Sequence, residues 1–86
     1  MKFLIEWHIK PKYRKEAAKA IEKFKQPKEL KTVFAAHNCV ASNRGIAVVE
    51  AEDAKVIQKT LNPMLDYTDF TVTPILPIFP ERKRNR

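Results

Sequence analysis

The stretch Lys2-Phe-Leu-Ile-Glu-Trp-His-Ile9 decides the fold, because it alternates in the way that a β-strand with two different faces does. Successive side chains of a strand point to opposite sides of a sheet. One side carries the odd-numbered apolar residues Phe3, Ile5, Trp7 and Ile9. The other side carries Leu4 and two ionisable residues, Glu6 and His8. The pattern predicts a sheet with one face packed against helices and an opposite face that is open to a ligand or a partner.

A helix is predicted directly after this strand. Pro11 favours a helix start, and the helix should end before Pro27, because the residue that precedes a proline is disfavoured in the helical region. Four apolar or aromatic residues recur at helical spacing in between: Tyr13, Ala17, Ile21 and Phe24. We expect this stripe to face the sheet.

The remainder of the chain predicts two strands, a helix and a final strand. The strands are expected at 32–40, 46–51 and 70–76. The second helix should follow Glu52 and Asp53, whose carboxylates can cap its free amide groups. The segment 42–45 is expected to form a hairpin turn in which Gly45, the one glycine of the chain, has a positive φ and tolerates no replacement.

The element order βαββαβ predicts an α+β fold of the ferredoxin-like type, with a four-stranded antiparallel sheet and two helices on one face. Pro74 cannot donate a hydrogen bond to a neighbouring strand, so the last strand should lie at a sheet edge. This topology places it there. The residues expected on the open face are Leu4, Glu6, His8, Ala47, Val49, Thr71 and Thr73.

Composition limits the class of protein. The 86 residues are expected to form one domain, 1–80, followed by a basic disordered tail, 81–86. Cys39 is the one cysteine, so it cannot form an internal disulfide, and we expect it to be a small buried residue. No spacing indicates a zinc module, a cofactor or a membrane span, and we expect a cytoplasmic protein. A chain this short buries only about 60 to 65 per cent of its surface, which favours an oligomer.

The chain resembles a family of small bacterial proteins that are grouped as a domain of unknown function within the dimeric α+β barrel superfamily. The resemblance rests on residues 1–7, His37, 45–53, 65–66 and 72–76. It implies a homodimer in which two open sheet faces pack together. The residues themselves also allow an interface formed by the edge strands and the extension 75–79. Enzymes related to that family use a pocket between the sheet and its helices or loops for small organic molecules, but the family itself implies no reaction. Similar proteins have tryptophan where Ala36 stands and aromatic residues in the second helix, so an aromatic-walled pocket should be reduced here.

The candidate catalytic residues are His37, Glu6 and His8. If they converge on the open face, Glu6 can orient an imidazole that acts as a general base. Thr71 and Thr73 would then supply neutral hydrogen bonds to a small organic ligand. The structural alternative is that Glu6 pairs with a base while both histidines form hydrogen bonds across strands or in a dimer interface. We predict no metal site, because the spacing of these residues does not require one.

A second functional class is a non-catalytic interaction or regulatory protein. The formal net charge is +7, and seven bases lie in 10–25. Such a surface attracts acidic proteins or nucleic acid without a dedicated site. RNA-recognition domains share the βαββαβ order but stack bases on aromatic residues of the open face. The strands here offer no such platform, so nucleic acid is the less favoured partner.

Overall fold

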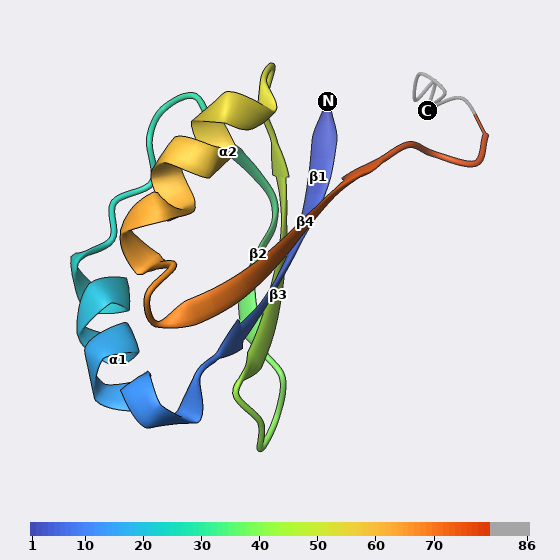
Figure 1. Cartoon of the computed structure of the whole chain (residues 1–86). Helices are drawn as coiled ribbons and strands as arrows, with labels where there is room; N and C mark the ends of the chain where they lie inside the picture. Colours follow the sequence, from blue (N-terminus) through green and yellow to red (C-terminus); the bar gives the residue numbers. More distant parts are fainter. Residues whose placement is uncertain (80–86) are drawn as a thin grey trace.

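The computed structural model describes residues 1–79 and has four strands and two helices in the predicted order. Its elements are β1 (Lys2–Ile9), a 3-10 turn η1 (Pro11–Tyr13), α1 (Arg14–Lys23), β2 (Lys31–Asn38), β3 (Arg44–Glu50), α2 (Ala54–Leu61), a second 3-10 turn η2 (Asn62–Met64) and β4 (Thr68–Ile75). Both helices lie on one side of the sheet, and the other side is open (Figure 1). The predicted α+β, ferredoxin-like fold is confirmed. Position 80 and the tail predicted at 81–86 lie outside the described residues.

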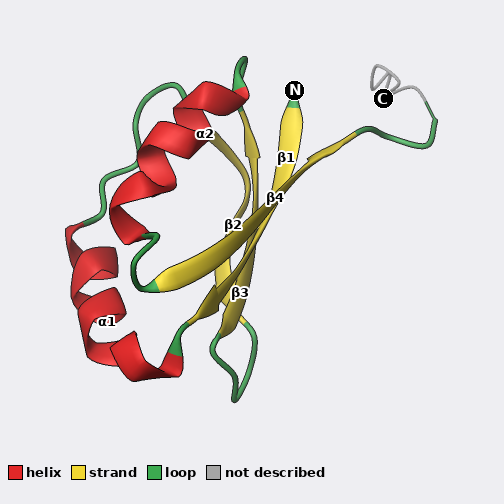
Figure 2. Ribbon diagram, in the orientation of Figure 1, coloured by secondary structure: helices red, strands yellow, loops and turns green. Residues whose placement is uncertain are grey.

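The four strands form one antiparallel sheet in the order β2-β3-β1-β4. They are drawn in yellow in Figure 2, with the helices in red. β4 is therefore an edge strand, as Pro74 predicts, and Pro74 lies opposite Phe3 of the central strand. The other edge strand is β2, in which all eight residues are exposed. Its pairing with β3 is irregular at two points, between Thr32 and Phe34 and between Phe34 and His37. Such bulges bend an edge strand away from a regular ladder.

The helices pack onto the centre of the sheet. α2 begins where the Asp53 side chain accepts a hydrogen bond from the Lys55 backbone N–H at 2.8 Å, and its Ile57 is 2 % exposed. A single core contains Phe3, Ile5, Leu30, Val49, Ala51 and Ile57. α1 ends before Pro27 as predicted, but only Ala17 of the expected stripe is buried. Ile21 and Phe24 remain 53 % and 40 % exposed, so α1 does not fill the space above β2 and β3.

The prediction that Ala47 and Val49 lie on the open face is wrong. Ala47 pairs with Ile5 and Val49 with Phe3, and both are buried on the face that the helices cover. The four residues 46–49 are all apolar, so alternation of polarity does not mark their two faces. The polar ends of the strand, Arg44 and Glu50, belong to the open face.

Gly45 is needed for a different reason than predicted. It lies inside β3, opposite Trp7, and has no positive φ; the positive φ of the turn falls on Ala41 at 57°. A Cβ atom at Gly45 would overlap the indole ring of Trp7. The glycine therefore permits a close approach of a side chain to the backbone.

The expectation of a buried Cys39 is also wrong, because this cysteine is exposed. It follows the last residue of β2, an edge strand whose eight residues are all exposed. Its backbone N–H donates to the Arg44 carbonyl at 2.8 Å, which closes the hairpin between β2 and β3.

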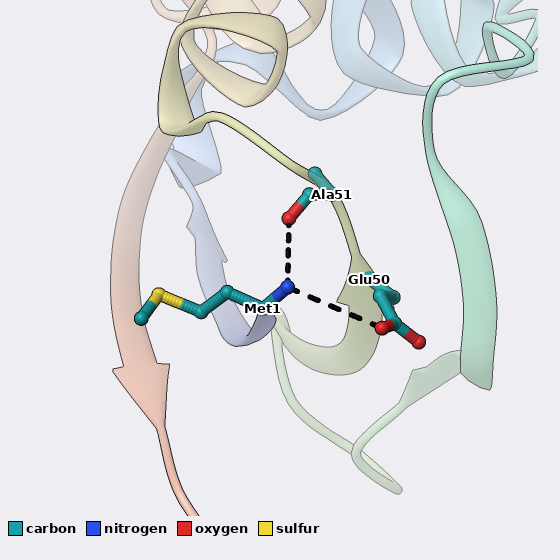
Figure 3. A network of polar contacts seen from close by, with 3 residues as sticks. All are labelled: Met1, Glu50 and Ala51. Carbon is teal, nitrogen blue, oxygen red and sulfur yellow. Dashed lines mark hydrogen bonds and ion pairs between the residues drawn. The ribbon is translucent and has the colours of Figure 1, made fainter.

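The first residue is held against the end of β3 (Figure 3). The Met1 amino group donates to the Ala51 carbonyl at 3.0 Å and lies 4.0 Å from a carboxylate oxygen of Glu50. The Ala51 N–H in turn donates to the Met1 carbonyl at 3.0 Å. The ladder between β1 and β3 thus continues one residue beyond both strands. The ion pair is half exposed and contributes little by itself.

Candidate functional site

A cleft of about 310 Å³ lies between the helices and the covered face of the sheet. Its floor is formed by β1 and β3, with Ile5, Trp7 and Ala47 among the lining residues. Ile57 of α2 and Phe70 of β4 also line it. The wall is mostly apolar, as is typical of small-molecule sites.

The cleft exists because small side chains and a short helix leave space above the sheet. Ala36 on β2 and Ala47 on β3 both line it, and each leaves room that a larger side chain would occupy. Ile21 lines the cleft from α1 but stays half exposed, which shows how incompletely the helix closes it. Ala36 presents only a methyl group to the cleft, so the wall has no aromatic side chain at this position.

A few polar groups also line the cleft. The Gln26 side-chain amide donates to the Leu30 carbonyl at 2.7 Å and to the Thr32 hydroxyl at 3.1 Å. The Thr60 hydroxyl donates to the Val56 carbonyl at 2.7 Å. The Asn38 carboxamide has no hydrogen-bond partner among residues 1–79, although Asn38 lines the cleft from β2. The Asn38 carboxamide is therefore available to a ligand.

The structure places the predicted site residues on the opposite, open face. Glu6 lies between Ile46 of β3 and Thr71 of β4, and His37 lies on the far side of Ile46. Glu6 and His37 are thus two strands apart, or roughly 9 to 10 Å at the usual strand spacing. They share a row of the sheet but are not neighbours in it.

The remaining predicted residues occupy the adjoining rows of that face. Thr73 lies opposite Leu4, and His8 lies opposite Asp69 of β4. None of the five predicted residues lines the cleft between helices and sheet. The proposed role of this face in ligand binding stays a prediction.

His37 is held by its own strand. Its ring stacks on Phe34 with a centroid separation of 4.5 Å and an interplanar angle of 19°. Its Nδ1 atom lies 2.6 Å from the Ala35 carbonyl oxygen, which favours the tautomer in which Nδ1 donates. Within the described range 1–79, no group of three His, Cys, Asp or Glu side chains could hold a metal ion.

Sequence reasoning missed the cleft residues because it assigned β3 to the wrong parity. Because Ala47 was assigned to the open face, the space that its small side chain leaves on the covered face was not predicted. The signal was nevertheless present: Arg44 and Glu50 mark the even-numbered positions as exposed, which places Ala47 under the helices. The incomplete cover by α1 has no comparable signal, because Ile21 and Phe24 fit the helical stripe regardless of how closely they pack.

Two further findings concern the whole described chain. No helix within residues 1–79 has both the length and the apolar character that crossing a bilayer requires. A family model matches residues 1–79, and its description is a domain of unknown function, DUF3303. Comparison with curated proteins and with solved structures gives no match.

Proposed function

The chain belongs to the DUF3303 family, and we propose that it is a homodimeric domain that binds a small, largely apolar organic molecule in the cleft between helices and sheet. The observation that carries this proposal is the cleft itself, whose volume of about 310 Å³ lies at the lower end of the usual range for ligand sites. A molecule with one or two fused rings suits that volume.

The apolar walls would supply most of the binding free energy. Removing about 200 Å² of ligand surface from water contributes about 5 kcal/mol, at about 25 cal/mol per Å². The lost translational and rotational freedom of the ligand offsets part of this gain. Orientation and specificity then depend on the few polar groups of the wall, of which the Asn38 carboxamide has no hydrogen-bond partner in the described chain.

The open sheet face supports the dimer part of the proposal. Leu4, Ile46 and Val48 lie together there in a central apolar band and are only half buried. A second copy that packs face to face would cover this band in both copies at once, as a two-fold interface requires. Glu6, His8 and His37 would then lie in or beside the interface, and the cleft on the other face would stay accessible.

Filling the cleft tests the binding proposal. Ala36→Trp places an indole in the cleft wall, and we expect it to weaken binding of neutral 1-naphthylacetamide at least about tenfold, because the ligand and the indole compete for the same volume. Titration calorimetry or naphthalene fluorescence measures the affinity.

Ala18→Trp is the matched control, since Ala18 is exposed on α1 and does not line the cleft. It should bind the probe as the unmodified protein does. Equal affinities of the two folded variants would contradict the proposed site.

A further inference from the structure

We propose that the ligand of the cleft is an amphipathic monoanion, whose apolar body occupies the cleft and whose carboxylate lies among three lysines at its outer side. This inference rests on the proposed function and adds the chemical class of the ligand. It follows from a second cavity that lies beside the cleft.

The second cavity, of about 580 Å³, is a more open hollow between the end of α1, the end of α2 and the segments that follow them. In Figure 1 these two helix ends lie close together on the outer side of the molecule. Apolar residues form much of the hollow, including Val56, Pro27 and Pro63. It is distinct from the open sheet face, so a face-to-face dimer would leave it accessible.

The two cavities share a wall. Phe24, Thr60 and Met64 line both of them. Phe24 follows the last residue of α1, has an extended backbone with φ −67° and ψ 133°, and is 40 % exposed. Because the same side chains line the hollow and the cleft, a ligand that extends past Phe24 can contact both.

The charged groups of the hollow favour an anion. Lys23, Lys25 and Lys59 line it, against one acid, Glu29. None of these four side chains forms an ion pair within the described part of the chain. Lys23 and Lys59 lie in the last turns of their helices, where they also complement the helix dipoles, but Lys25 lies outside α1 and has no such role.

The same geometry favours a single negative charge over a phosphate group. Both helices present their C-terminal ends here, and those ends carry partial negative charge. Phosphate sites typically use helix N-termini or the fork of an arginine, and no arginine lines the hollow. Lysines are mobile point charges that suit a carboxylate at the edge of an apolar site.

The experiment compares three probes with the same ring: 1-naphthylacetate, its neutral amide, and 1-naphthyl phosphate. We expect the acetate to bind about tenfold more tightly than the amide at low salt, and the phosphate no more tightly than the acetate. A variant with Lys23→Gln, Lys25→Gln and Lys59→Gln should bind acetate and amide equally.

The matched control replaces Lys15, Lys19 and Lys55 by Gln, which removes the same net charge from exposed positions that line neither cavity. It should keep the preference for the acetate. If the acetate binds no more tightly than the amide, and Ala36→Trp still weakens binding of the amide, the anion inference is overturned but the cleft remains the proposed binding site. The inference would also be overturned if both triple variants lost the preference for the acetate equally, or if the phosphate bound far more tightly than the acetate. Absence of binding by all three probes would contradict the proposed function itself.

Discussion

Trp7 lies across Gly45, and this contact makes the glycine a packing residue of the central sheet. We expect Gly45→Ala to lower the free energy of unfolding by about 2 to 3 kcal/mol, because the added methyl group must displace the indole from its place beside the core. Urea denaturation, followed by tryptophan fluorescence and by circular dichroism, measures the loss.

The control for Gly45 is the neighbouring turn. Ala41 has the positive φ of the hairpin, so Ala41→Gly should leave stability unchanged or raise it slightly. If Gly45→Ala is as stable as Ala41→Gly, the Trp7 ring moves aside without lowering the free energy of unfolding.

For a single residue, the sequence predicts the sheet face only where polar side chains distinguish the two faces. Glu6 and His8 interrupt an apolar run, so their face could be assigned correctly. Ala47 and Val49 belong to an unbroken apolar run, and their assignment was wrong because only pairing with β1 decides it. Gly45 could be predicted to matter because it is the one glycine of the chain. The reason could not be predicted, since the position of the Trp7 ring depends on the assembled sheet.

Among the elements, the boundaries that depend on local chemistry were the most predictable. Proline limits the end of α1, Pro74 identifies β4 as an edge, and an acidic residue begins α2. The degree to which α1 covers the sheet was not predictable, because it depends on how the helix sits above β2 and β3. That incomplete cover creates the cleft, which is why the candidate site was harder to foresee than the fold.

The start of α2 allows a test of how much its capping hydrogen bond stabilises the protein. We expect Asp53→Ala to lower the free energy of unfolding by about 1 kcal/mol, because the Lys55 N–H loses the side-chain acceptor that caps the helix. Thermal and urea unfolding measure this change.

Glu52→Ala is the adjacent control. Glu52 is exposed and does not cap the helix, so its replacement should change stability by only a few tenths of a kcal/mol. Equal losses from the two substitutions would show that charge near the helix start, and not the capping hydrogen bond, stabilises α2.

For the whole molecule, the open face predicts self-association. We expect the protein to sediment as a dimer at micromolar concentration, and Val48→Asp to shift it to monomer, because the substitution places a carboxylate in the central apolar band. Sedimentation equilibrium measures both states.

Val40→Asp introduces the same change at a turn residue that is 95 % exposed, and it should leave the dimer intact. A monomeric unmodified protein at that concentration, or a Val48→Asp dimer of unchanged strength, would refute the face-to-face arrangement.

The position of a bound ligand shows whether the binding site is the cleft between helices and sheet. The measurement is nuclear Overhauser spectroscopy of 1-naphthylacetamide bound to protein labelled at the methyl groups of Ala, Ile, Leu and Val. Cross-peaks from the ring protons to the Ala47 and Ile57 methyl groups are the result we predict, since both residues line the cleft. Cross-peaks to Leu4, Ile46 and Val48 instead would place the ligand on the open face beside Glu6 and would show that the cleft is not the binding site.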